Sequence, residues 1–197
     1  KKNNDRIIYA AVSGFGCYGP KSLRPGYDII AQATGGLMSI TGEPGRHGIR
    51  VGNAMGDVLG GMNLTIGILI ALHARTITGK GQRVDVSLVD SVVSSLETGT
   101  QRYFASGKQP ELMGNRYAAA YPYDSFKASD GFFVIGCGND KLFSLFCNNV
   151  LNRPELLEDS RFATNIKRCE YHAELKPIIE EWSVNYSIDE AVDLLNE

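Results

Sequence analysis

The sequence is poor in cysteine, and its few cysteines form no pattern that binds a metal. The four, Cys17, Cys137, Cys147 and Cys169, make no CxxC pair and have no short Cys/His spacing. A zinc site, and more generally any metal site, is therefore not predicted. We expect free and mostly buried thiols, and a cytoplasmic location, because a reducing compartment keeps cysteines unpaired.

The chain also lacks a strong excess of positive or negative charge and lacks long hydrophobic segments. The net charge of −2 gives no general attraction to nucleic acid or to an anionic membrane. The polar start of the chain, residues 1–5, lacks the apolar core of a signal peptide. The apolar stretch at 66–74 falls short of the ~20 residues of a membrane span. We therefore expect a buried helix there, and neither nucleic acid nor membrane as a partner.

The first half of the chain alternates short β-branched or apolar runs with helical patterns. Strands are predicted at 6–12, where the run is apolar and should be buried, and at 83–87. Helices are predicted at 27–39, with Ile29, Ile30, Ala33 and Leu37 on one face, at 58–76 and at 88–105. The order strand, helix, helix, strand, helix predicts an α/β fold.

The second half begins after a segment rich in glycine and alanine. We expect a linker at 104–121, between a large-domain part at 1–103 and a smaller α+β domain at 122–197. Runs at 123–128 and 132–137, joined through Ser129-Asp130-Gly131, predict a β-hairpin. Helices are predicted at 140–151, from 154 onward, and from 189 to the end. The chain lacks an initiator Met and ends inside a helical pattern, so we expect this domain to be incomplete at its C-terminus.

One carboxylate stands out in this pattern. Residues 56–61, Gly-Asp-Val-Leu-Gly-Gly, place Asp57 among three glycines, just before the apolar helix. A helix N-terminus offers free N–H donors and the positive end of the dipole, which favour the carboxylate form. Asp57 is thus a candidate nucleophile. Aspartate is also a favoured helix cap, so the local pattern leaves both roles open.

Short motifs in a fixed order surround Asp57. They are SGFG at 13–16, PGYD at 25–28, QA at 32–33, GGLM at 35–38, TGEP at 41–44, GD at 56–57 and TGKGQRVDVSLVD at 78–90. The ordered series resembles the class III CoA-transferases, which include formyl-CoA and carnitine CoA-transferases and, as a divergent branch, α-methylacyl-CoA racemase. The resemblance covers nearly the whole chain. It implies part of a Rossmann-like large domain that binds CoA, followed by a smaller α+β domain, and an interlocked homodimer in the full-length family.

The resemblance also implies a chemistry. Asp57 would attack the thioester of an acyl-CoA, and CoA would pass to a small carboxylic acid through aspartyl intermediates. The CoA thioester is then a substrate, and no permanently bound cofactor is expected. Arg24 is one of several cations that could meet the CoA phosphates. The implied set that contacts CoA or the substrate is Tyr27, Leu88, Arg24, Gly56 and Gly60.

Two alternatives stay open at this point. One is an acyl-CoA racemase on the same fold, which needs two acid/base groups. Tyr27 stands where the racemase branch carries His, and Asn139 where it carries Glu, so both positions favour transfer. The other alternative is an inactive fragment with only a structural role. The segment 114–120 is rich in alanine where some family members have a glycine-rich loop that closes over the site.

Overall fold

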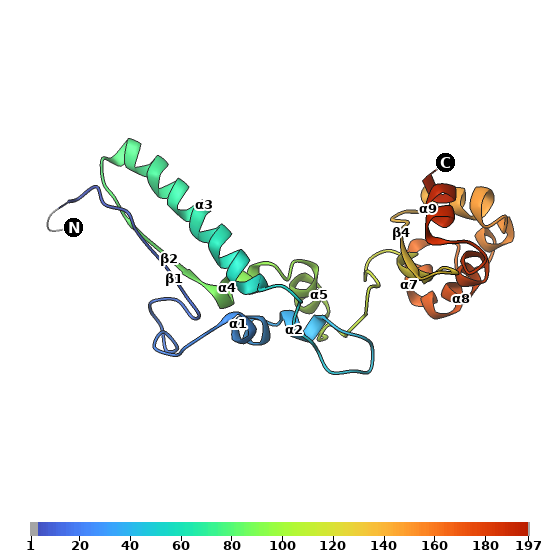
Figure 1. Ribbon diagram of the computed structural model, residues 1–197, viewed down its shortest axis with the longest axis horizontal. Coiled ribbons are helices and arrows are strands. Elements are labelled where there is room, and N and C mark those ends of the chain that lie inside the picture. The colour runs from blue at the N-terminus through green and yellow to red at the C-terminus, as the bar shows by residue number, and fades with distance from the viewer. Residues whose placement is uncertain (1–3, 197) are drawn as a thin grey trace. The chain divides into compact units, whose positions relative to one another are not determined.

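The computed structural model describes residues 4–196 and divides the chain into two compact units (Figure 1). The first unit ends at Gly114 and the second begins at Asn115. This division falls inside the segment 104–121, which the sequence predicts as a linker. Each unit has its own two-stranded sheet and its own buried cluster.

The first unit is built on two parallel strands joined through helices. β1 (Tyr9–Ser13) pairs with β2 (Arg83–Ser87) in the register Tyr9↔Arg83 to Ser13↔Ser87. Parallel strands need a long crossover. Here it contains α1 (Asp28–Thr34), α2 (Leu37–Ile40) and α3 (Met55–Thr78), and α3 lies along both strands (Figure 1). The predicted strand at 83–87 is confirmed, and the α/β class with it.

Two predicted helices are each split in the structure. The helix predicted at 27–39 is α1 and α2, separated at Gly36, whose φ is 91°. The helix predicted at 88–105 is α4 (Leu88–Ser94) and α5 (Thr98–Ser106), separated before Glu97, whose φ is 41°. A left-handed backbone residue cannot continue a right-handed helix. The expected shared face is also wrong, since Ile29 and Ile30 are exposed.

α3 is longer than predicted and packs closely through its glycines. It begins three residues before 58 and ends at Gly79, which is left-handed with φ 71°. A Cβ on Gly60 would lie 2.5 Å from Leu88 Cδ2, and one on Gly67 would lie 2.6 Å from a Val84 methyl group. The lack of side chains on one face therefore lets α3 approach β2 and α4 closely.

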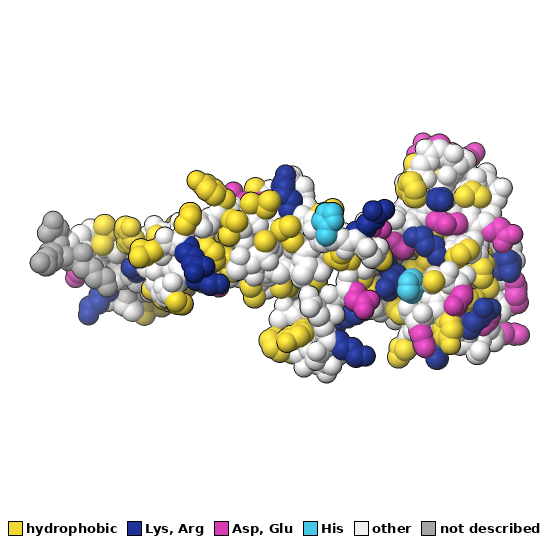
Figure 2. All heavy atoms as spheres, turned by 90° about the horizontal axis from the view of Figure 1, so that it is seen from below, with side chains coloured by type: hydrophobic (Ala, Val, Ile, Leu, Met, Phe, Trp, Pro, Cys, Tyr) yellow, Lys and Arg dark blue, Asp and Glu magenta, His cyan; other side chains and the backbone are white. Residues whose placement is uncertain are grey.

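The opposite face of α3 is exposed, which corrects the expectation of a buried helix. Ile70 and Ile77 are 61% and 74% exposed, and β1, predicted as buried, exposes Tyr9 and Val12. By length and composition alone α3 could cross a membrane, with 17% of its most apolar window buried. The apolar stretch at 66–74 thus lies within a longer helix, and the absence of a membrane partner stays a prediction. Figure 2 shows apolar side chains over much of the visible face of this unit.

The second unit is a hairpin covered by short helices. β3 (Tyr123–Lys127) and β4 (Phe132–Gly136) pair antiparallel, which confirms the predicted hairpin. The helices are α6 (Asp140–Leu145), a π-helical turn η1 (Phe146–Val150), a 3-10 turn η2 (Pro154–Leu157), α7 (Asn165–Glu170), α8 (His172–Ser183) and α9 (Ile188–Asn196). The helix predicted from 189 to the end includes Glu197, which lies outside the described residues.

The core of the second unit is aromatic and contains one buried cation. Phe126, Phe143 and Phe162 are among its fully buried side chains. Arg168 is buried beside them and donates to the carbonyl oxygens of Tyr121 and Phe162 and to Asp140, at 2.8, 3.0 and 2.7 Å. Its charge is thereby compensated, as a buried guanidinium requires. These bonds tie α7 to α6 and to the segment before β3.

Candidate functional site

Asp57 is the third residue of α3 and its side chain is exposed. The N-cap position belongs to Ala54, whose methyl side chain cannot cap the helix. The Asp57 carboxylate has no hydrogen bond or ion pair within residues 4–196. Between the two roles that the sequence left open, the structure therefore gives no capping role to this side chain. It is a free carboxylate at the positive end of a 24-residue helix.

Some of the first backbone N–H groups of α3 donate hydrogen bonds and one does not. Met55 donates to Asn53 O at 2.9 Å, Val58 to Ala54 O at 3.0 Å, and Gly56 to Asp28 Oδ1 at 2.8 Å. The N–H of Asp57 has no partner in the described part of the chain. One free donor thus lies next to the candidate nucleophile, where a developing oxyanion could use it.

The bond from Gly56 to Asp28 joins the N-terminal ends of α1 and α3. Tyr27 directly precedes Asp28, and Asp57 directly follows Gly56, so both candidates lie at the same end of the first unit. This is also the end where the parallel strands finish, because Gly60 of α3 packs against Leu88 and Val12. Open α/β folds bind ligands beyond the carboxyl ends of their strands.

A compact loop at 14–26 lies beyond the same strand ends. Gly14 and Gly26 pack so tightly that a Cβ on Gly14 would lie 2.5 Å from Gly26 Cα. The carbonyl of Gly14 accepts the Val89 N–H at 3.1 Å, which fixes the loop to the start of α4. Arg24 belongs to this loop. The glycine pair therefore holds a cationic loop near the end of the sheet at which Asp57 stands.

Tyr27 and Arg24 are open to solvent. Tyr27 is 78% exposed at the N-cap position of α1, and Arg24 is exposed with no side-chain partner within residues 4–196. Both side chains are free to meet a ligand. No residue of the described chain holds either of them in a fixed place.

The other three predicted contacts are buried and have packing partners. Leu88 is 8% exposed and lies against Gly60, while a Cβ on Gly56 would meet Asp28 and Ala31 at 3.1 and 3.2 Å. Packing inside the first unit is therefore enough to explain why these residues are small or apolar. Their contact with CoA stays a prediction.

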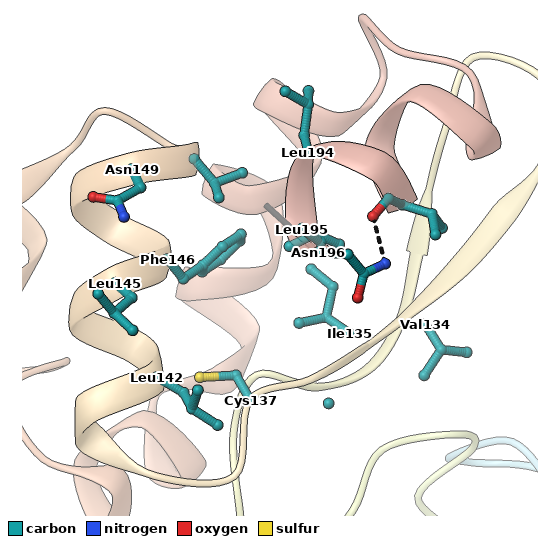
Figure 3. A pocket seen from close by; sticks show the side chains of 13 residues that line it. Val134, Ile135, Cys137, Leu142, Leu145, Phe146, Asn149, Leu194, Leu195 and Asn196 are labelled. Atoms are coloured by element: carbon teal, nitrogen blue, oxygen red, sulfur yellow. Dashed lines mark hydrogen bonds between the residues drawn. The ribbon is translucent and has the colours of Figure 1, made fainter.

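A cavity of about 710 Å³ lies in the second unit (Figure 3). Apolar side chains line it, among them Ile135, Leu142 and Phe146. Burial raises the pKa of the Cys137 thiol at its wall, which leaves a poor nucleophile. None of the predicted site residues lines this cavity, and its lining within residues 4–196 contains no carboxylate for acyl transfer.

Metal chemistry finds no support in the described chain. Residues 4–196 contain no group of three or more His, Cys, Asp or Glu side chains placed to hold an ion. All four cysteines are free, and burial raises the pKa of the Cys147 thiol to about 12.

Two residues of this site were missed by sequence reasoning, Asp28 and Gln32. The Asp28 carboxylate accepts from the Gly56 N–H and from Gln32 Nε2, and Gln32 is fully buried. Their spacing of four residues on a predicted helix was a signal, because such pairs face each other. The contact with Gly56, which lies 28 residues away, has no local signal.

Together these features define an α/β protein with an exposed carboxylate at a helix N-terminus, beside the carboxyl ends of two parallel strands. The chain belongs to CoA-transferase family III, which matches residues 1–197.

Named relatives agree with this assignment. The chain is 43% identical over 181 residues to the acetyl-CoA:oxalate CoA-transferase of Acetobacter aceti, covering 91% of the chain and 46% of that protein. It is 39% identical to the succinyl-CoA:glutarate CoA-transferase of Mus musculus, covering 88% and 39%. A solved CAIB/BAIF family protein from Brucella suis has a TM-score of 0.82 at 39% identity, covering 98% and 51%. The chain thus spans about half the length of these proteins.

Proposed function

We propose that the full-length protein containing this chain moves CoA from an acyl-CoA thioester to an acceptor carboxylic acid. Asp57 is the covalent nucleophile. The observation that carries the proposal is its exposed, unpaired carboxylate beside a free N–H, in a chain of CoA-transferase family III. The relatives named above are CoA-transferases for the small acids oxalate and glutarate, which supports this class of substrate.

The reaction proceeds through two aspartyl intermediates. An Asp57 oxygen attacks the thioester carbonyl carbon, the C–S bond breaks, and CoA leaves as the thiolate with a mixed anhydride left behind. The thiolate then attacks the aspartyl carbonyl carbon, which releases the donor acid as its carboxylate and forms an aspartyl-CoA thioester. The acceptor carboxylate repeats the two steps in reverse. The free N–H of Asp57 is placed to stabilise negative charge that develops on a carbonyl oxygen.

The remaining predicted residues bind CoA in this proposal. Tyr27 orients the thioester, Arg24 meets a phosphate, and Leu88 with the glycines at 56 and 60 shapes the wall of the site. CoA is a substrate and no resident cofactor is proposed. The full-length protein acts as a homodimer, as the family resemblance implies, and in the cytoplasm, as expected from its unpaired cysteines.

The racemase alternative loses support at Asn139. This residue is the N-cap of α6, and its Oδ1 accepts the Leu142 N–H at 2.9 Å. A side-chain amide does not ionise near neutral pH, so it cannot remove or return the proton that racemisation requires. Tyr27 likewise offers a phenol where an imidazole would be needed.

The test is to trap the acyl group on the full-length enzyme. With acyl-CoA and hydroxylamine, the wild type should form a hydroxamate on the peptide containing Asp57, detected by mass spectrometry. Asp57→Asn should lose the label and lower kcat by roughly 10³-fold or more, because the bond-forming group is gone. Asp189→Asn, the same change at an exposed position in the first turn of α9, is the matched control. A label on another residue, or normal turnover by Asp57→Asn, contradicts the proposal.

A further inference from the structure

We propose that Asp28 and Gln32 are a positioning pair that holds residues 51–56, and through them the Asp57 carboxylate, in the reactive place. The inference rests on the proposed role of Asp57. Neither residue is assumed to touch the substrate. Their contacts, their burial and the chemistry of their donors and acceptors carry the argument.

The pair makes a continuous chain of hydrogen bonds from α1 to the start of α3. Gln32 Oε1 accepts the Val51 N–H at 2.9 Å, and Gln32 Nε2 donates to Asn53 O at 3.2 Å. The same Nε2 donates to Asp28 Oδ2 at 2.9 Å, and Asp28 Oδ1 accepts the Gly56 N–H at 2.8 Å. Three backbone groups within six residues are thereby fixed by two side chains of a neighbouring helix.

The direction of each bond follows from the chemistry of Asp28. A carboxylate only accepts, so Gln32 must turn its NH₂ group toward Asp28 and its oxygen toward the Val51 N–H. A flipped amide would face Val51 with a donor and Asp28 with an acceptor. Gln32 is also fully buried, where an unsatisfied polar atom is costly. The charge on Asp28 therefore selects a single arrangement of the loop.

Within residues 4–196, few other side-chain bonds hold the segment, although Gly56 packs against Ala31 and Met55 donates to Asn53 O. Ala54 cannot cap α3, and Gly52 has no neighbour within 4 Å of the position a Cβ would take. Arg50 does bond to the Val51 and Gly52 carbonyls at 3.1 and 2.9 Å, but both bonds are local and leave residues 53–56 untouched. Without Asp28, the Gly56 N–H would lose its acceptor. The residue next to it is Asp57.

The kinetic test uses Asp28→Asn in the full-length enzyme. Asparagine keeps the shape but turns an NH₂ group toward either Gln32 or Gly56, so kcat should fall by at least ~10-fold, as expected when a reacting group is misplaced. KM for acyl-CoA should change less than kcat, because the pair does not touch the ligand. Asp189→Asn should leave both constants unchanged. A smaller fall in kcat, or a fall carried by KM, overturns the inference.

A second variant separates positioning from loss of folding. When Asp28→Asn is combined with Gln32→Glu, the new amide at position 28 can donate to the new carboxylate at position 32, while the amide oxygen accepts from Gly56. The new carboxylate can also accept the Val51 N–H. Asn53 O loses its Gln32 donor in this variant and in Gln32→Glu alike. The double variant should therefore turn over faster than Gln32→Glu, and a double variant no faster than Gln32→Glu overturns the inference.

The single change Gln32→Glu has its own signature. This variant places a new carboxyl group at position 32 beside the Asp28 carboxylate. The kcat of the variant should therefore fall as pH rises through the range in which the second of these two carboxyl groups ionises. The double variant should lack this fall, because it holds a single carboxylate at the pair. The same pH profile in both variants overturns the inference.

Hydrogen exchange tests the pair without any turnover. In the wild type, the Gly56 amide should exchange more slowly than the Asp57 amide, which has no acceptor within the described residues. Asp28→Ala, which offers no acceptor to Gly56, should remove that difference. Equal exchange of the two amides in the wild type overturns the inference. A hydroxylamine label on a residue other than Asp57 would instead refute the proposed function, and the exchange result would still be valid.

Discussion

At the scale of single residues, the site contrasts two neighbouring carboxylates. Asp28 accepts hydrogen bonds from Gly56 and Gln32, while Asp57 has no partner within residues 4–196 and is exposed. A carboxylate whose lone pairs are occupied is a poor nucleophile, and one that is free can attack a carbonyl carbon. The same residue type thus serves two roles that its surroundings separate.

Tyr27 is expected to help and not to be essential. Tyr27→Phe removes one hydroxyl from a 78% exposed side chain. It should cost one hydrogen bond, ~0.5–1.5 kcal/mol in kcat/KM, or up to about tenfold. Tyr103→Phe, on an exposed tyrosine of α5, is the control. Complete loss of turnover with an intact fold would contradict this role, and deuterium at the α-carbon of acyl-CoA in heavy water would revive the racemase alternative.

At the scale of elements, α3 carries the site because one of its faces has almost no side chains. Gly60 and Gly67 lie against Leu88 and Val84 so closely that a methyl group would overlap them. The close packing of α3 against β2 and α4 determines the position of the first turn of α3. The glycines near Asp57 therefore act first through packing.

Two adjacent glycines give a matched test of this packing. Gly60→Ala should gain about 1 kcal/mol of helix propensity and lose ~1–3 kcal/mol to overpacking against Leu88. Gly61→Ala meets nothing within 4 Å and should only gain the propensity. In urea unfolding of the full-length protein, Gly60→Ala should thus be less stable than Gly61→Ala by ~1–3 kcal/mol. Equal stability would mean that Leu88 moves aside without cost.

At the scale of the whole chain, the two units differ in how much apolar surface they bury. Among residues 4–196, the second unit encloses a core of fourteen buried hydrophobic residues, while the first has a cluster of three, Ala31, Leu88 and Val92. The first unit instead exposes one face of α3, and each of its two paired strands has a free edge. Exposed apolar faces and open strand edges favour association.

The 197 residues expressed alone should therefore associate and should not turn over CoA. Ile66, Ile70 and Ile77 share the exposed stripe of α3, so Ile70→Lys with Ile77→Lys should lower the associated fraction measured by light scattering. Ile166→Lys changes an isolated exposed isoleucine of α7, 78% exposed, and should change association little. A soluble monomer that exchanges CoA between acids would contradict both expectations.

The sequence by itself determined the elements with strong local signals. The strand at 83–87 and the hairpin around Asp130-Gly131 follow from β-branching and turn chemistry. The position of Asp57 at a helix N-terminus and the family follow from ordered motifs. All of these depend on residues close to one another along the chain.

The tertiary structure alone decided what depends on distant residues. The capping of Gly56 by Asp28, the packing of Leu88 on Gly60 and the exposure of α3 join or separate residues far apart in the sequence. The break between α4 and α5 at Glu97 is a further case. Glutamate does not favour a left-handed backbone, so its sequence neighbours do not predict this break. Local patterns record what a residue prefers. Only the fold determines which partners are within reach, and that is why the positioning of Asp57 could not be predicted from its neighbours in the chain.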